Sequence, residues 1–368
     1  MKYSFDKYVA FRGRIFPDPA RKTVFMNWTC TGFRCTFVGK KLQAKFLGIS
    51  EKALGNENVL EHPYVGVTVD DGDELVKRFC ILPGENWYTL YESETQQHHT
   101  ITVWKLSENF RGKCGLMELK TDGRMLEQSE KEPDLKIEFV GDSITCGYGN
   151  EASDRDDPFL PEEENGFITY AMHAARELNA QASCVSVSGI TVAVDPNRKF
   201  PMEMLGMEDL YPYADRPYEE RTGADGLTAW DFEKHPVDAV VINLGTNDVN
   251  AYKLAEDEAG VAAASGFFKE HYMGFLETVR RCNGPDAFLL CTLGPLDHYL
   301  YDEIRDAVTT YKAETGDERV DCFKFRGVVQ WSEGFGAVGH PSAQTHIRMG
   351  KELAAKLRQC LPDKGRMK

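Results

Sequence analysis

Hydrophobic and polar positions alternate along the first third of the chain, in short runs that turn residues separate. The run at 64–82 predicts two strands around a tight turn at 70–73. Turn signals recur about every ten residues and no long helical stripe occurs, so we predict a β-sandwich of the jelly-roll type for residues 1–130. The other alternating runs lie at 30–49, with a break at Gly39-Lys40, at 87–93 and at 98–107.

The rhythm changes after a polar segment at 121–136. Short, nearly continuous apolar runs then recur, as expected of strands that are covered on both faces. Helical patterns with apolar residues at three- and four-residue steps separate them, which predicts a doubly wound α/β domain with a parallel sheet over residues 131–368. The apolar runs lie at 136–140, 182–188, 237–244, 286–293 and 320–325, and the helical patterns at 166–179, 265–282, 300–313 and 343–359.

Charge narrows the classes of partner. The formal net charge of the 368 residues is -15, which disfavours nucleic acid and an anionic membrane surface because both would repel the protein. The N-terminal residues show no apolar core of a secretion signal, and the ten cysteines are scattered without a CxxC pair. We therefore expect a cytoplasmic protein with reduced cysteines. The oligomeric state stays open.

Chemically active residue types stand where the apolar runs end. In a parallel α/β sheet, ligands bind beyond the carboxyl ends of the strands. The first run ends at Gly141-Asp142-Ser143, the second at Ser188-Gly189 and the third at Gly245-Thr246-Asn247-Asp248. The fifth leads to the sequence GHPSAQTH, which contains His340 and His346. Each piece alone is typical of a cap or a turn.

Together these residues would suit acyl transfer. The Ser143 hydroxyl needs a base to become a nucleophile, and His340 could supply it. The N–H groups of Ser143 and Gly189 and the side-chain amide of Asn247 could bind the oxyanion of a tetrahedral intermediate. Asp142, Asp248 and His346 fit structural roles better.

Three competing motifs fail around the serine. A phosphate-binding P-loop needs Lys and then Ser or Thr after its last glycine, but Asn150-Glu151 follows Gly149. Gly147 and Gly149 give only part of a dinucleotide fingerprint, and Thr145 replaces the last glycine of a lipase-type nucleophile elbow. The histidines lack metal-ligand spacing, so the sequence predicts no metal and no cofactor.

The motifs GDSI, Gly189, GTND and HPS, in this order, resemble the four blocks of the SGNH (GDSL-type) hydrolases. GDSITCGYGN, LTAWDF and VVINLGTND look like carbohydrate esterase family 2. This resemblance implies an N-terminal β-sandwich and an SGNH domain, a three-layer α/β/α fold with a parallel five-stranded sheet. It also implies removal of acetyl groups from xylan, mannan or their oligosaccharides, and in some members acetyl transfer between sugars. Ser143 would be the nucleophile, His340 the base, and Ser143, Gly189 and Asn247 the oxyanion hole.

One position departs from the superfamily pattern Asp-x-x-His, since residue 337 is alanine. Val338 and Gly339 carry no carboxylate either. Some family members use a Ser-His dyad in which a backbone carbonyl orients the imidazole, and we favour such a dyad here. A third acid from elsewhere in the chain is the alternative.

Aromatic side chains near the motifs are candidates for sugar contacts. Trp331, which precedes the histidine loop, is the first choice, and Trp230 and Tyr148 follow. Two rival functions stay open. One is a lipase or thioesterase of the same superfamily acting on other short acyl esters, and the other is a carbohydrate-binding protein with an inactive hydrolase domain.

Overall fold

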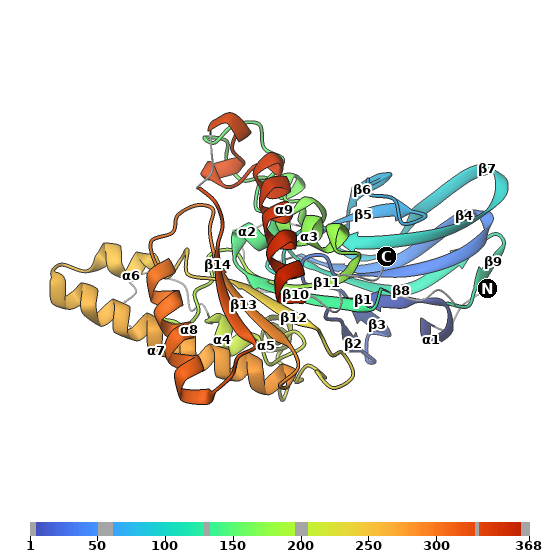
Figure 1. Ribbon diagram of the computed structural model, residues 1–368. Coiled ribbons are helices and arrows are strands. Elements are labelled where there is room, and N and C mark those ends of the chain that lie inside the picture. Colours follow the sequence, from blue (N-terminus) through green and yellow to red (C-terminus); the bar gives the residue numbers. More distant parts are fainter. Residues whose placement is uncertain (1–4, 51–61, 129–132, 196–204, 328–330, 362–368) are drawn as a thin grey trace. The chain divides into compact units, whose positions relative to one another are not determined.

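The structure, a computed structural model, describes residues 5–50, 62–128, 133–195, 205–327 and 331–361 (Figure 1). The chain divides into two compact units. The first contains Met1–Glu132, Leu160–Phe167 and Asp215–Leu227, and the second contains the remaining segments. The boundary predicted at 130/131 lies outside the described residues.

The first unit is an antiparallel sheet domain, as predicted. Among its described residues, nine strands join in one sheet in the order β2-β3-β8-β4-β7-β5-β6, and β1 and β9 also pair with β4. A core of buried aromatic and aliphatic side chains, including Phe33, Phe37 and Phe46, fills this unit. The elements are α1 (Phe5–Tyr8), β1 (Ala10–Arg12), β2 (Phe16–Asp18), β3 (Thr23–Phe25), β4 (Gly32–Ile49), β5 (Tyr64–Val69), β6 (Lys77–Cys80), β7 (Gly84–Lys105), β8 (Lys113–Thr121) and β9 (Arg124–Leu126).

Two long strands replace the shorter runs expected in this unit. The expected break at Gly39-Lys40 is a shift of register inside β4, which runs for 18 residues. The run at 87–93 and residues 98–105 of the run at 98–107 likewise belong to one strand, β7, of 22 residues. A shift of register interrupts the alternation of side chains along a strand, and here the strand continues past it. The two strands of 64–82, by contrast, are confirmed as β5 and β6.

A later segment of the chain completes the first unit. Asp215 precedes α5 (Arg216–Thr222) and caps it by accepting from the Tyr218 N–H. The carboxylate of Asp215 also accepts from the side-chain amides of Asn27 and Asn109, both at buried positions. Tyr218 packs its ring on Phe25. These buried hydrogen bonds fix the segment to the sheet domain, and the local sequence around Asp215 does not predict them.

The second unit is the parallel α/β domain that the periodicity predicts. Its described strands form a five-stranded sheet in the order β11-β10-β12-β13-β14, and every neighbouring pair is parallel. All five apolar runs are thus confirmed as strands, shifted by one or two residues at their ends. They are β10 (Leu135–Gly141), β11 (Ala180–Ser186), β12 (Ala239–Asn243), β13 (Phe288–Leu293) and β14 (Val320–Lys324).

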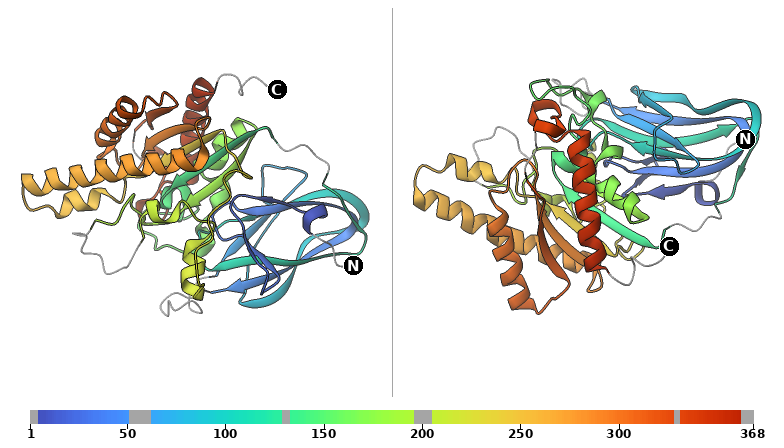
Figure 2. Two further views of the ribbon diagram at one scale, coloured as in Figure 1. Left: turned by 90° about the horizontal axis from the view of Figure 1, so that it is seen from below. Right: turned by 45° about the horizontal axis from the view of Figure 1, so that its top comes forward.

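Helices cover both faces of this sheet. The amphipathic helices α3 and α9 pack against each other on one face, and α7 and α8 lie on the other (Figures 1 and 2). None of the described helices has the length and apolar character that a bilayer span requires. The helices of this unit are α2 (Ser143–Cys146), α3 (Tyr170–Glu177), α4 (Met207–Leu210), α6 (Val249–Leu254), α7 (Glu258–Asn283), α8 (Tyr301–Thr315) and α9 (Ala343–Cys360).

Candidate active site

Ser143 stands at the carboxyl end of β10, as the first residue of α2. Asp142 caps this short helix because its side chain accepts a hydrogen bond from the Ile144 N–H at 3.0 Å. Gly147 ends the helix with φ 84°, in the left-handed region that favours glycine. The serine side chain therefore sits on a tight, well-capped turn at the edge of the sheet where ligands bind.

Asp142 is a scaffold residue here. Its side chain is completely buried, and burial raises the pKa of the carboxyl to about 7. Its hydrogen bond to the backbone of the nucleophile turn fixes the shape of that turn. This agrees with the structural role expected of Asp142.

The His340 side chain contacts the Ser143 side chain, although the two residues lie 197 positions apart in the sequence. The imidazole Nε2 lies 3.0 Å from the Ser143 Oγ, and Nδ1 lies 3.1 Å from the backbone carbonyl oxygen of Ala337. A carbonyl oxygen only accepts, so Nδ1 must carry the proton of that hydrogen bond. Nε2 is then left with its lone pair toward the serine hydroxyl. The arrangement suits a general base that takes the hydroxyl proton.

The backbone turn before His340 holds the Ala337 carbonyl in place. The Ala337 N–H donates to the Gly149 carbonyl at 2.9 Å, and the Val338 N–H donates to the Asp157 carbonyl at 3.2 Å. Val338 has φ 52° and ψ 35°, left-handed values that are rare for a β-branched residue. Backbone strain of this kind persists where the surroundings fix the conformation, and it gathers at functional sites.

Gly149 explains why the histidine loop can approach the serine loop so closely. A Cβ atom added to Gly149 would lie 2.4 Å from the Ala337 Cβ, and Gly149 itself has φ 54°. Ala337 is completely buried. The glycine-rich sequence after Ser143 thus gives room for the small residue that carries the carbonyl.

The candidate oxyanion donors come from three strand ends that hydrogen bonds connect. The Val187 N–H, just after β11, donates to the Gly141 carbonyl at the end of β10. The Asn247 side-chain amide donates to the Ile190 carbonyl at 2.9 Å, which joins the loops after β12 and β11. Gly189, between these contacts, has φ 79°. The Ser143 N–H opens α2 and has no acceptor within that helix.

Comparisons with known proteins decide the family. The family model of GDSL-like lipases and acylhydrolases matches residues 137–353, and the model of the N-terminal domain of carbohydrate esterase family 2 matches residues 11–128. The chain belongs to carbohydrate esterase family 2. The resemblance read from GDSI, GTND and HPS is therefore confirmed, and so is the fold class that it implied.

Relatives of this family 2 chain include the cellulase/esterase CelE of Acetivibrio thermocellus, which is 30% identical over 96% of this chain. This chain spans 39% of the length of that protein. An acetylxylan esterase/glucomannan deacetylase of Cellvibrio japonicus is 23% identical over 88% of this chain and 81% of its own. A family two carbohydrate esterase from Clostridium thermocellum, solved with cellohexaose, is 28% identical, with TM-score 0.80 and coverage of 96% and 99%.

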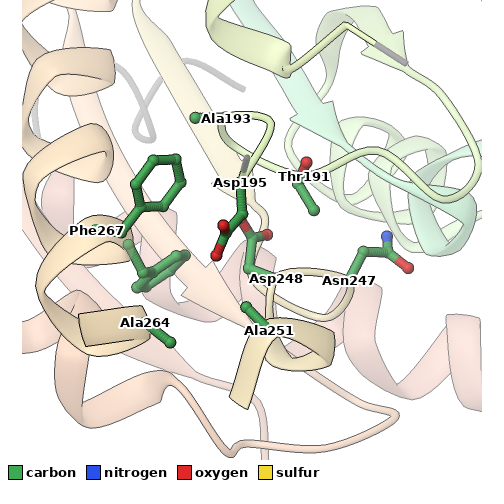
Figure 3. Close-up of a pocket in the computed structure, with 9 residues that line it drawn as sticks. Thr191, Ala193, Asp195, Asn247, Asp248, Ala251, Ala264 and Phe267 are labelled. Carbon is green, nitrogen blue, oxygen red and sulfur yellow. The ribbon is translucent and has the colours of Figure 1, made fainter. Parts of the chain in front are cut away.

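Asp248, the last residue of the GTND motif, is the other acidic residue beside the candidate site. Its carboxylate accepts from the Val192 N–H at 3.0 Å. Figure 3 shows this carboxylate next to that of Asp195, while the Asn247 amide lies apart from both. They line a pocket of about 20 Å³ that also includes Phe267. Asp248 thus shapes the loop that presents Asn247.

His346 is buried in α9, as the structural interpretation requires. Its Nδ1 accepts a hydrogen bond from the Tyr170 N–H at 3.1 Å, and its ring lies parallel to the Tyr170 ring. Burial lowers the pKa of His346 to about 3, so the imidazole is neutral at physiological pH.

The three aromatic candidates fall in different places. The Tyr148 ring lies 4.4 Å from the His340 ring and stacks on Phe159 at 4.1 Å, so it forms one wall beside the base. Trp331 is 74% exposed in the loop that leads to His340. Trp230 stacks on His235 in the segment before the amino end of β12, whereas the dyad lies at the carboxyl ends.

Two parts of the site could not be assigned from the sequence. One is the identity of the backbone carbonyl in the expected dyad, that of Ala337, because every residue has such a carbonyl and the residue type does not mark it. The other is Arg155, whose guanidinium lies 5.3 Å from the Trp331 ring centroid and 5.2 Å from that of Phe335. An isolated arginine in a polar loop gives no signal by itself, but two aromatic residues near the histidine motif could have prompted a search for a cation.

Proposed function

We propose that this protein is a carbohydrate O-acetyl esterase that removes acetyl groups from acetylated mannan, xylan or their oligosaccharides. The observation that carries the proposal is the contact of 3.0 Å between the Ser143 Oγ and the His340 Nε2 in a chain of carbohydrate esterase family 2. Relatives named acetylxylan esterase and glucomannan deacetylase, and the related structure with cellohexaose, support the substrate class.

The reaction begins with the Ser143 hydroxyl. Its oxygen attacks the acetyl carbonyl carbon while His340 Nε2 takes the hydroxyl proton. The Ala337 carbonyl accepts the Nδ1–H throughout, so it fixes the tautomer and interacts favourably with the imidazolium that forms. A carbonyl carries less charge than a carboxylate, so we expect weaker stabilisation of that cation than in a Ser-His-Asp triad.

The tetrahedral intermediate then places negative charge on the former carbonyl oxygen. The N–H groups of Ser143 and Gly189 and the Asn247 amide are the donors that would bind this oxyanion. When the intermediate collapses, the sugar oxygen leaves with the proton from His340, and the acetyl group stays on Ser143. Water, activated by His340, then releases acetate. An acceptor sugar hydroxyl in place of water would give acetyl transfer.

The test is acetyl release from defined acetylated mannan and xylan oligosaccharides, followed by NMR of the acetyl protons. Signal loss with formation of free acetate supports hydrolysis, and new acetyl signals on an added acceptor sugar support transfer. The variants S143A and H340A should each lose at least about 10³-fold in kcat, because either change removes a member of the unit that carries the chemistry.

Matched controls are S93A and H98A, which remove the same residue types from the long strand β7 of the other unit. His98 is exposed, and the Ser93 hydroxyl donates to the Thr95 carbonyl. Both should retain full activity. Full activity of S143A or H340A would refute the dyad. Faster turnover of longer acyl esters than of sugar acetates would support a lipase or thioesterase, and glycan binding without turnover would support an inactive binding protein.

A further inference from the structure

Trp331 is the most exposed large hydrophobic side chain among the described residues, with 74% of its surface open to solvent. Two neighbours hold its ring. The Phe335 ring lies edge-on at 4.9 Å, and the Arg155 guanidinium lies 5.3 Å from the indole centroid. Single exposed apolar residues are common on protein surfaces, so exposure alone identifies no site.

The turn that carries Trp331 is anchored firmly to α9. It is a 3₁₀ turn, Trp331–Glu333, and its last residue binds three side chains of the α9 segment. The Glu333 carboxylate accepts from Arg348 at 2.6 and 3.1 Å and from the Thr345 hydroxyl at 2.9 Å, and its carbonyl accepts from the Ser342 hydroxyl at 2.6 Å. Hydrogen bonds from Arg348 lower the pKa of Glu333, which keeps this pairing ionised. An aromatic ring on such a support needs little further ordering to bind a ligand.

The same residues border the catalytic base on both sides. Phe335 forms a β-bridge with Pro341, the residue after His340, and the Arg155 carbonyl accepts from the N–H of Gly339, the residue before it. The two residues whose side chains contact the Trp331 ring thus pair through their backbones with the residues on either side of His340.

We propose that Trp331, Phe335 and Arg155 form a sugar-binding subsite, which we call the Trp331 platform, for a pyranose ring of the oligosaccharide next to the acetylated residue. The proposal rests on the carbohydrate esterase function proposed above. A pyranose ring presents a face of C–H groups that packs on an indole ring, and its hydroxyls can accept from a guanidinium. Arg155 also holds the indole in place through its contact with the ring.

Binding measured without turnover tests the platform directly. In the S143A background, isothermal titration with unacetylated mannohexaose and xylohexaose should show a Kd about 10-fold higher after W331A, because truncation of an aromatic anchor usually costs more than 1 kcal/mol. W331F should recover most of this loss. R155M should raise Kd about 2- to 5-fold, the usual effect of an exposed cation–π contact, and R155K should recover part of it.

The control is W87A. Trp87 lies on β7 of the other unit and is 43% exposed, so it is a surface tryptophan outside the proposed platform. W87A should leave the hexasaccharide Kd unchanged. Equal Kd values for W331A and W87A would overturn the platform.

Turnover separates failure of the platform from failure of the proposed function. For W331A, the ratio of kcat/KM on an acetylated hexasaccharide to kcat/KM on 4-nitrophenyl acetate should fall at least 5-fold, mainly through KM. Acetate release with an unchanged ratio would refute the platform and leave the esterase function standing. Trp331-dependent binding of hexasaccharides by an enzyme that releases no sugar acetate would refute the function and support the platform. If no hexasaccharide binds at all, the platform is wrong.

Discussion

Replacement of Val338 by proline would move the carbonyl that orients the catalytic base. The carbonyl of Ala337 belongs to the peptide unit that joins it to Val338, so the φ angle of Val338 sets its direction relative to His340. Val338 has φ 52°, and proline is restricted to about -65°. Proline also removes the N–H that donates to the Asp157 carbonyl at 3.2 Å and pushes the preceding residue out of helical geometry.

The size of the effect follows from the bond that is lost. The Nδ1–H of His340 donates to the Ala337 carbonyl at 3.1 Å, and the ring becomes positively charged during the reaction. A hydrogen bond to a charged group contributes about 1.5–3 kcal/mol. At about 1.4 kcal/mol for each factor of ten, V338P should lower kcat/KM about 10- to 150-fold. The side chain is 61% exposed, so little packing is lost.

V338G is the matched control. Glycine adopts left-handed φ without the steric cost of about 1–2 kcal/mol, although its freedom in the unfolded chain offsets roughly half of that gain. V338G should therefore retain most of the activity, with a stability equal to the wild type or up to about 1 kcal/mol higher. The assay is kcat/KM on 4-nitrophenyl acetate and on an acetylated oligosaccharide, with circular dichroism and urea unfolding to verify the fold.

A folded V338P with kcat/KM within a factor of two of the wild type would show that the Ala337 carbonyl does not orient the base. A loss of activity in V338G as large as that in V338P would mean that the valine side chain matters rather than the backbone angle. If V338P does not fold, V338G and V338A still test the role of the backbone angle. Both variants can keep the left-handed angle at 338, so both should keep their activity.

Three further changes test the surroundings of the dyad. G149A should lower kcat at least about 10-fold, since a new Cβ would lie 2.4 Å from that of Ala337, and unchanged kinetics would refute the tight fit. Burial raises the pKa of Asp142 from 3.8 to about 7, so ionisation of this carboxyl destabilises the fold as pH rises through that range. Between pH 4 and 7, D142N should therefore become more stable than the wild type by up to about 4 kcal/mol in urea unfolding. A stability difference that does not change with pH would contradict this. Burial lowers the pKa of His346 from 6.5 to about 3, so the stability contributed by the neutral imidazole is present above pH 6.5 and is lost as pH falls toward 3. Glutamine can still accept from the Tyr170 N–H, so H346Q should make the free energy of unfolding less dependent on pH in this acid range. A pH profile of stability parallel to that of the wild type would refute the assignment.

The periodicity of the sequence predicts most of the second unit because each strand there is buried on both faces. The run at 237–244 becomes β12 and the run at 286–293 becomes β13, each a few residues shorter. In the first unit the same reasoning divides β4 at Gly39, where the register shifts and the strand continues. The alternation of side chains shows which face of a strand is buried, and a shift of register interrupts that alternation without ending the strand.

Long-range placement sets a second limit. Asp215 reads as an ordinary helix cap, and it does cap α5. Its bonds to Asn27 and Asn109 reach across 188 and 106 residues of the chain. These hydrogen bonds join residues that are far apart in the sequence, so no short stretch of sequence predicts them. The same holds for Arg155, whose aromatic neighbours lie far along the chain.

Because residue 337 is alanine, its residue type does not identify it as the group that orients His340. A carboxylate at 337 would be recognisable in the sequence, whereas a carbonyl exists at every position and acquires its role only from geometry. Here that geometry depends on Gly149, which admits Ala337, and on the left-handed angle of Val338. These two positions therefore mark the dyad in the sequence indirectly. In this protein, a backbone carbonyl orients the histidine in place of an aspartate, and the positions that depend on this are a glycine with no room for a Cβ and a valine with a strained backbone before the histidine.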